Sequence, residues 1–446
     1  MNIFKILRSK YNIQIRDYRL YLSIFTSVLA KFVAIGATLI TIPLTLNYLG
    51  AESFGVWMVI SGVIGFISFS DLGVGMGLQN ALSKACGETD YDSPKYYIAN
   101  AYLIITSLAI TLALLVVVLF AELPMRSLFN IKNEILLSDA VLALKYSLLA
   151  FFLGMPIALI QRILGGIQET YVANNVMLVG SVISLISIFT AVHFDLGLTG
   201  LSVLFVLSPS SALLFYALFF FYKNRQLCPK FSNLSKDHLS SVLSAGAWTV
   251  FVQIIYTAKM NVPTMIISAS LGLLAVAEYS VAQKLTALAS TMIGLALQPL
   301  WVVYGEAYHR GDKLWIENTL KKSIKLVLLL TVLAAIAFQF LGQPLITLWL
   351  GGQVLPSKML IICFSLWMIA STVNVSLTMV MNGTGNFKKQ SIISVFFVSL
   401  CLLLVYIFSP EYGIISVVLI MFLFSELLVI PFYWVECKRI INSISK

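Results

Sequence analysis

The sequence predicts an all-α membrane protein with twelve transmembrane helices in two six-helix bundles around a central cavity. The first supporting observation is composition: apolar residues make up 59% of the 446 residues and charged residues only 11%, whereas soluble domains carry about 25% charged residues. The second is the number of long apolar runs, and the third is a repeat between the two halves of the chain. The alternating pattern of a transmembrane β-barrel would give a more polar average, so a barrel is not expected.

Twelve runs have the roughly 20 mainly apolar residues that a spanning helix requires. The breaks between them are short, and none has the about 40–60 residues that even a marginal soluble domain needs. The runs are 21–46, 53–81, 96–120, 140–161, 171–193, 196–222, 243–270, 273–304, 320–341, 358–381, 391–409 and 413–435. The expected organisation is a basic N-terminal segment (1–20), an N-terminal bundle (21–222), a cytoplasmic linker (223–242), a C-terminal bundle (243–437) and a cytoplasmic tail (438–446).

The positive charges predict how the chain crosses the membrane. With the N-terminus inside, 22 of the 29 Lys and Arg residues fall in cytoplasmic segments, and only Arg126, Lys132 and Lys358 fall in outer loops. Because Lys and Arg are retained on the cytoplasmic side, both termini are expected in the cytoplasm. This orientation explains the net charge of +10, so no nucleic-acid partner is expected.

The two halves share landmarks in the same order. Leu49-Gly50 corresponds to Leu271-Gly272, and Asp90 corresponds to Asp312, both at an offset of 222. Gly165 is matched with Gly385, and the Asp-Leu-Gly of 195–197 with the Glu-Tyr-Gly of 411–413. Six spans per half give both halves the same orientation, which predicts parallel repeats and suits alternating access.

Four lysines, Lys31, Lys145, Lys259 and Lys284, lie within predicted spans. A charge in a span is costly and marks a functional hypothesis, although Lys145 is near enough to a span end to reach the interface. Lys31 and Asp71 lie 19 and 21 residues from Gly50. At 1.5 Å per residue they have similar depth, so a salt bridge between them is predicted, either structural or functional.

Lys259 and Lys284 lie 13 and 12 residues from Gly272, which places both about 18–20 Å below the outer turn. Two ammonium groups at one depth repel unless they face apart or share an anion, and lysine is a suitable partner for phosphate. Glu426 is predicted at similar depth and would neutralise one lysine. The alternative is a Lys–Glu pair that only holds the C-terminal bundle together.

The sequence carries no catalytic constellation. The motifs HExxH, G-x-S-x-G and Walker A are absent, and the five cysteines form no CxxC pair, so no metal, cofactor or disulfide framework is expected. Energy for transport would then come from an ion gradient. Asp71 and Glu426, the two acids well inside spans, are the candidate proton or sodium sites.

The stretch from Thr41 to Asp90 resembles the N-terminal signature of polysaccharide exporters of the multidrug/oligosaccharidyl-lipid/polysaccharide superfamily. The shared features are the YLG-x-x-x-F-G-x-W turn (48–57), DLG-x-G-x-G (71–77), the later GTGNFKK (383–389) and the twelve spans. Within the superfamily the chain looks like the Wzx-type O-antigen flippases. The lipid II flippase branch usually has two further helices.

The resemblance implies a bacterial inner-membrane protein that moves an undecaprenyl-diphosphate-linked oligosaccharide to the periplasmic leaflet. Polysaccharide polymerase and chain-length regulator proteins are implied as partners. Lys31, Lys259, Lys284 and Arg162 are the expected substrate-binding residues, although the positive-inside rule also explains Arg162. The alternatives are a multidrug or toxin cation antiporter of the same superfamily and, from another class, a membrane polysaccharide polymerase or ligase.

Overall fold

The computed structural model describes residues 13–68, 71, 73–88, 90, 92–120, 124–235, 238–239, 247–297 and 300–444. These residues are almost entirely helical and contain no strand. Parts of the predicted N-terminal segment (1–12), linker (236–237 and 240–242) and tail (445–446) lie outside the described residues.

The chain divides into two compact units by its internal contacts. Unit 1 is formed by Met1–Leu49, Ile67–Met125 and Glu134–Val250, and unit 2 by Gly50–Phe66, Arg126–Asn133 and Phe251–Lys446. The long helix α2 (Ile13–Ile67) contributes to both units, because non-helical backbone at Gly50 divides it into two helices.

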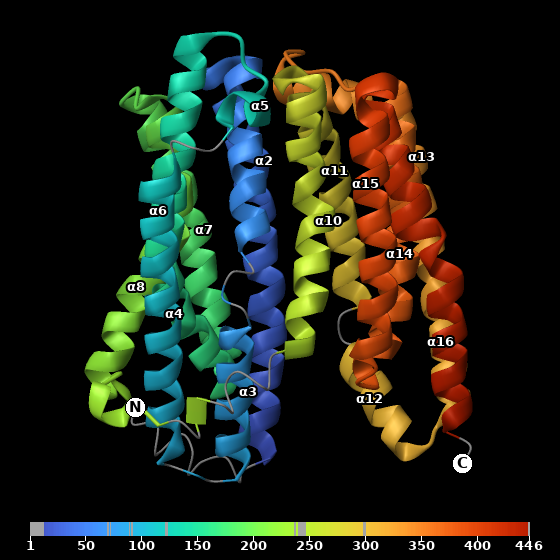
Figure 1. Ribbon diagram of the computed structural model, residues 1–446. Coiled ribbons are helices and arrows are strands. Elements are labelled where there is room, and N and C mark those ends of the chain that lie inside the picture. The colour runs from blue at the N-terminus through green and yellow to red at the C-terminus, as the bar shows by residue number, and fades with distance from the viewer. Residues whose placement is uncertain are drawn as a thin grey trace. The chain divides into compact units, whose positions relative to one another are not determined.

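Unit 1 is a bundle of long helices that follow one another along the chain (Figure 1). Besides the first part of α2 it contains α3 (Val74–Gly87), α4 (Ser93–Leu119), α6 (Glu134–Gly166), α7 (Thr170–His193) and α8 (Gly197–Lys223). Two 3-10 turns, η3 (Arg225–Leu227) and η4 (Phe231–Asn233), follow α8. Apolar side chains on all faces make these helices suited to a lipid environment.

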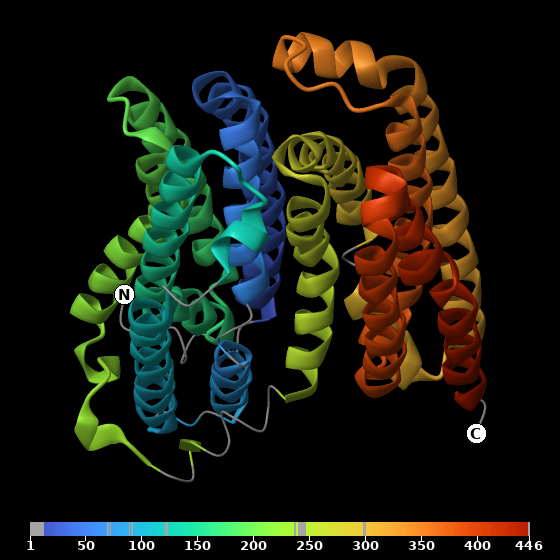
Figure 2. The ribbon, with the colours of Figure 1, turned by 45° about the horizontal axis from the view of Figure 1, so that its top comes forward.

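Unit 2 contains the second part of α2 and the C-terminal helices (Figures 1 and 2). The short α5 (Met125–Phe129) also falls mostly here. The C-terminal helices are α10 (Ala247–Leu271), α11 (Leu273–Leu297), α12 (Leu300–Arg310), α13 (Lys313–Leu350), α14 (Lys358–Gly383), α15 (Phe387–Ile420), the π-helical η5 (Met421–Leu427) and α16 (Val429–Ser443).

Eight helical stretches of the described chain are long and apolar enough to cross a membrane. Tyr21–Ile67 contains the first predicted run and the first part of the second, which continues in α3, and Lys388–Ser443 contains the last two. The seventh run corresponds to α10, and the eighth to α11 together with α12. All twelve predicted runs therefore fall largely on described helix.

The predicted match between Asp90 and Asp312 has a local geometric basis. The Asp90 carboxylate accepts the N–H of Ser93, and the Asp312 carboxylate accepts the N–H of Trp315, each over 3.1 Å. The backbone N–H groups of the two aspartates donate to Ala85 and Ala307, five residues back. The same turn therefore leads into α4 and into α13 at an offset of 222, as a repeat requires.

Turn conformations support two of the other matches and change one. Gly50 and Gly272 have φ of 75° and 87°, and Gly197 and Gly413 have φ of 66° and 69°. Gly385 has φ of 75°, but its counterpart in the first half is Gln168 (φ 60°) and not Gly165. The N–H groups of Gln168 and Gly385 each donate to the carbonyl three residues back, at Gly165 and Asn382, so the offset here is 217.

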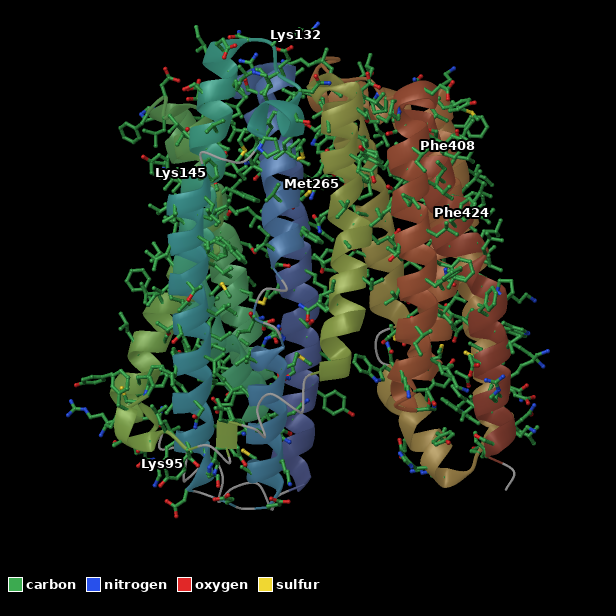
Figure 3. All side chains as sticks on the ribbon, in the orientation of Figure 1. Lys95, Lys132, Lys145, Met265, Phe408 and Phe424 are labelled. Carbon is green, nitrogen blue, oxygen red and sulfur yellow. The ribbon has the colours of Figure 1, made fainter. Side chains whose placement is uncertain are left out.

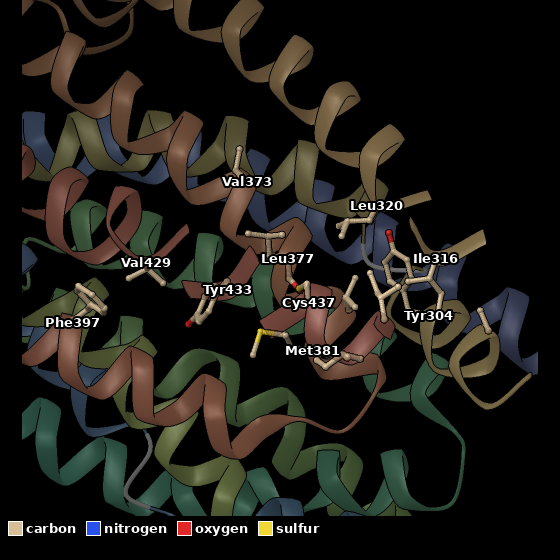
Figure 4. Close-up of a cluster of buried hydrophobic side chains, with 14 residues drawn as sticks. Tyr304, Ile316, Leu320, Val373, Leu377, Met381, Phe397, Val429, Tyr433 and Cys437 are labelled. Atoms are coloured by element: carbon tan, nitrogen blue, oxygen red, sulfur yellow. The ribbon is translucent and has the colours of Figure 1, made fainter. Parts of the chain in front are cut away.

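A large apolar cluster holds the C-terminal half of unit 2 together (Figure 4). Tyr304 from α12, Ile316 and Leu320 from α13, Leu377 from α14 and Cys437 from α16 are all buried in it. This packing holds α12, α13, α14 and α16 together.

Candidate functional site

Glu426 in unit 2 is a buried carboxylate with three side-chain donors. It is 1% exposed and lies in the π-helical η5. Its Oε1 accepts a hydrogen bond from Lys259 Nζ over 2.6 Å and from Trp367 Nε1 over 3.0 Å, and its Oε2 accepts one from Asn374 Nδ2 over 2.6 Å. Both carboxylate oxygens are thus satisfied, and Lys259 supplies the counter-charge.

Trp367 and Asn374 were not among the residues predicted from the sequence. They are seven residues apart on α14, so they project from the same face two turns apart. Both are buried, with 6% and 7% exposure. Asn374 also donates to the backbone carbonyl of Glu426 over 3.1 Å, while its Oδ1 has no partner among the described residues. In the sequence, the only indication of this contact was Asn374, a polar residue seven positions after Trp367 in a mainly apolar helix.

The π-helical turn is what presents Glu426 to α14. π-Helical segments inside α-helices are rare and occur often at functional sites. Ser425, the neighbouring residue, satisfies its hydroxyl within η5 by donating to the carbonyl of Met421 over 2.7 Å. The π-helical geometry is therefore confined to one short segment, and Glu426 lies within it.

Lys259 and Lys284 occupy similar positions on either side of the Gly272 turn but have different partners. Lys259 on α10 is bound to Glu426, with 15% of its side chain exposed. Lys284 on α11 is partly buried, and within the described residues it has neither a hydrogen-bond acceptor nor a carboxylate partner. Lys284 is thus a basic side chain within a helix of unit 2 with which no described carboxylate forms an ion pair.

In unit 1 the structure interrupts the predicted second span. Helix α2 ends at Ile67, α3 begins at Val74, and Gly73 between them has φ of 77°. Asp71 lies in this break, where its Oδ1 accepts the N–H of Gly73 over 3.1 Å. The sequence predicted helix through this stretch because it lies inside a long, mainly apolar run (53–81).

Arg162 on α6 lies beside the same break. A Cβ atom on Gly75 would lie 2.8 Å from Asp71 Oδ2 and 3.1 Å from Arg162 Nε, so both charged groups are packed against this glycine. Arg162 Nη1 also donates to Met76 Sδ over 3.2 Å. The absence of a side chain at Gly75 makes room for this cluster.

The structure places Lys31 on the first part of α2, half-buried. Asp71 accepts a hydrogen bond from Gly73 and lies beside Arg162. No ion pair joins Asp71 to Lys31 in the described part of the chain. The residues brought together are therefore Asp71 with Arg162 in unit 1 and Lys259 with Glu426 in unit 2.

Other charged residues lie toward the ends of unit 1. Lys95 at the start of α4 and Lys145 on α6 lie toward opposite ends of the unit (Figure 3), and Lys145 Nζ lies 5.9 Å from the ring of Phe120. Burial raises the pKa of Glu169, which precedes α7, and Arg19 opposes this rise. Hydrogen bonds from Ser93 lower the pKa of Asp90.

The chemistry of these groups is that of charge binding. Among the described residues no group of three or more His, Cys, Asp or Glu side chains is arranged to hold a metal ion. The cationic groups are suited to bind phosphate.

Residues 21–302 match the family described as "Polysaccharide biosynthesis protein". The chain belongs to this family. A protein of Salmonella typhi named "Putative O-antigen transporter" is 23% identical over 292 residues, which cover 63% of this chain and 64% of that protein. The chain therefore spans just under two thirds of this relative's length.

Solved structures show the fold of this family member. An inward-facing multidrug resistance MATE family transporter of the MOP superfamily has a TM-score of 0.76 at 15% identity, covering 94% of this chain and 99% of that chain. A MOP superfamily transporter from Pyrococcus furiosus has a TM-score of 0.69 at 16% identity, covering 97% and 96%. The predicted all-α membrane fold of the MOP type is confirmed, and these relatives and neighbours are transporters, not enzymes.

Proposed function

We propose that this protein moves an undecaprenyl-diphosphate-linked oligosaccharide, such as an O-antigen repeat unit, across the bacterial inner membrane. The lipid-linked sugar enters from the cytoplasmic leaflet and leaves in the periplasmic leaflet by alternating access. The family and the O-antigen transporter relative support a polysaccharide cargo, and the fold supports transport.

Lys284 is the observation that carries the proposal. A diphosphate-linked lipid brings negative charge into the membrane, where an opposite charge on the protein is worth more than in water. Lys259 already has Glu426 as its partner, whereas Lys284 has no carboxylate partner among the described residues. Lys284 is therefore the principal phosphate contact in unit 2, with Lys259 secondary.

Arg162 and Lys31 are the proposed substrate contacts of unit 1. A guanidinium presents several N–H donors in a fixed plane, which matches phosphate oxygens better than a single ammonium does. Asp71 is packed against Gly75 next to Arg162 and limits the positive charge there. That balance favours release of the cargo over permanent capture.

A complementation assay in a strain that lacks its own exporter tests this proposal. The Lys284→Gln variant is expected to lower surface polysaccharide at least about tenfold, the loss of roughly one charge-assisted contact, at unchanged protein abundance. Lys145→Gln is the matched control, because Lys145 also lies in a helix of the membrane region but contacts Phe120, which caps the C-terminal end of α4. Full complementation by a Lys31, Lys259 and Lys284 triple alanine variant would refute the lysine assignment.

Glu426 and Asp71 are the proposed coupling groups for an ion gradient. Lys259 on α10 forms an ion pair with Glu426 in η5. A change in the charge of Glu426 would therefore alter how α10 and η5 pack. Both termini are proposed to lie in the cytoplasm, and a polysaccharide polymerase and a chain-length regulator are proposed as partners.

A multidrug antiporter remains the competing proposal because MATE transporters share the fold. The embedded charges argue for an anionic cargo: Lys31, Lys259, Lys284 and Arg162 outnumber Asp71 and Glu426. A drug-susceptibility panel separates the two. Altered resistance with normal surface polysaccharide in a deletion strain would favour the antiporter.

A further inference from the structure

A pocket of about 350 Å³ lies in unit 2 between the start of α13 and the last turns of α16. Its floor is apolar, formed by Leu320, Cys437 and Ile441, which are buried in the cluster of Figure 4. Its rim carries two lysines, Lys321 and Lys438. The pocket is separate from Glu426 and from Lys284, and the proposed transport makes no use of it.

The two rim lysines are not neutralised by the described residues. Neither forms an ion pair with a carboxylate there, although Lys438 Nζ lies 5.3 Å from the ring of Trp434. The nearby Glu436 is already bound by Lys389, over 2.9 Å, and by Arg439. Two ammonium groups that line one pocket, neither of them in an ion pair with a described carboxylate, leave a net positive site for an anion.

Glu317 determines the net charge and the hydrogen-bonding groups of the ligand that this pocket would bind. It lines the pocket together with the two lysines, so the three side chains sum to a single positive charge. A phosphodiester carries one negative charge and matches that sum, whereas a diphosphate carries more. The Glu317 carboxylate can only accept hydrogen bonds, so it favours a headgroup that also bears an O–H or N–H donor.

The surroundings point to a lipid. Trp434 lies at the pocket beside Lys438, and tryptophan and lysine together are typical of the level of the lipid headgroups. Basic pockets between membrane helices bind lipid headgroups on the cytoplasmic side, which is the side proposed for the α12–α13 turn and the C-terminus.

We propose that this pocket binds the headgroup of a phospholipid whose single phosphodiester lies between Lys321 and Lys438 and whose donor group is held by Glu317. Phosphatidylglycerol, with two hydroxyl groups, and phosphatidylethanolamine, with an ammonium, meet this requirement. Phosphatidylcholine lacks an O–H or N–H donor, so it should bind more weakly. The bound lipid joins α13 to α16 at the end of unit 2 that carries the C-terminus.

Lipid binding to the detergent-purified full-length protein tests the proposal. The melting temperature is measured while phosphatidylglycerol, phosphatidylethanolamine, phosphatidylcholine or inorganic phosphate is added, and the concentration dependence gives an apparent Kd. The first two lipids are expected to raise the melting temperature. The Lys321→Gln/Lys438→Gln variant should weaken phosphatidylglycerol about tenfold or more, as expected for losing charge-assisted contacts.

The control is the Lys322→Gln/Lys325→Gln variant, which removes the same charge from exposed positions of α13 outside the pocket and should leave the apparent Kd within about twofold. Glu317→Gln should reduce the discrimination against phosphatidylcholine. Equal weakening by the pocket and control variants would overturn the proposal, because it would indicate general attraction to charge. Stabilisation by inorganic phosphate equal to that by phosphatidylglycerol would overturn the lipid assignment and indicate a free anion.

Discussion

Glu426 illustrates at the scale of single residues how a buried charge depends on its partners. Removing Lys259 leaves the carboxylate buried without a counter-charge, and breaking a buried pair in this way costs about 3–5 kcal/mol. Removing both charges avoids this cost. The two substitutions are therefore expected to be strongly non-additive.

We predict that Lys259→Met lowers the amount of folded protein and its melting temperature sharply. Adding Glu426→Gln to that variant should restore most of the stability, because the glutamine carries no charge and its Oε1 can still accept from Trp367. The glutamine NH2 then faces Asn374, whose unpartnered Oδ1 can accept from it once that amide turns. Thermal unfolding in detergent measures both effects. If the single and double variants are equally unstable, the ion pair is not what holds α10 to η5.

Transport by the double variant then separates a structural from a coupling role. A pair that only holds the bundle predicts normal surface polysaccharide in the stable double variant. A coupling role predicts a stable protein that fails to transport. Glu411→Gln, at an exposed glutamate near the Gly413 kink, is the control for loss of a carboxylate elsewhere in unit 2.

The sequence identified the charged members of this site but not the neutral ones. Lys259 and Glu426 stand out because charges are rare in apolar runs. Trp367 and Asn374 do not, since tryptophan and asparagine occur in many membrane helices. The contact of Asp71 with the Arg162 region was also not predicted, because depth along a straight helix does not describe a residue in a break.

At the scale of secondary structure elements, α12 and α14 approach each other through two glycines. A Cβ atom on Gly383 would lie 2.5 Å from the Trp301 carbonyl oxygen and 3.0 Å from the Gly305 nitrogen. Both of these atoms belong to the backbone and cannot move aside independently. The first glycine of the GTGNFKK stretch is thus required by close packing, whereas Gly385 in the same stretch is required by its φ of 75°.

We predict that Gly383→Ala destabilises the protein by about 1–3 kcal/mol, the usual cost of overpacking. Gly294→Ala on α11 is the matched control. Nothing lies within 4 Å of its added Cβ, so alanine there should raise helix stability by about 0.5–1 kcal/mol. Melting temperatures in detergent measure both, and a Gly383→Ala protein as stable as the wild type would contradict the close approach.

The elements show where hydropathy is informative and where it is not. The positions of the twelve runs follow from the absence of charges, and all of them fall largely on helix. The break after Ile67 and the turn at Gln168 do not follow from hydropathy. Gly73, which ends the break, has a left-handed backbone conformation. The turn at Gln168 places a residue other than glycine at positive φ.

At the scale of the whole molecule, the repeat preserves turns but not charges. The aspartate turns at Asp90 and Asp312, which lead into α4 and α13, and the glycine turns recur in both halves. The counterparts of Lys259 and Lys284 at an offset of 222 are Ala37 and Gly62. The turns set the lengths of the helices and recur in both halves, whereas each half has its own embedded charges.

The distribution of Lys and Arg also predicts how the molecule is oriented in the membrane. Single-cysteine variants can test this orientation. We predict that a Lys132→Cys variant reacts with a membrane-impermeant maleimide in intact spheroplasts. An Arg225→Cys variant should react only after permeabilisation, because Arg225 belongs to the segments that hold 22 of the 29 basic residues. Both positions are exposed in the structure.

The native cysteines leave a low background for this test. Cys86, Cys363, Cys401 and Cys437 are buried, so Cys228 is the one native cysteine to replace with serine. Labelling of Arg225→Cys in intact spheroplasts, with protection of Lys132→Cys, would reverse the orientation. The proposed entry of the cargo from the cytoplasmic leaflet would then have to be reversed as well, since the basic ends of the helices would face the periplasm.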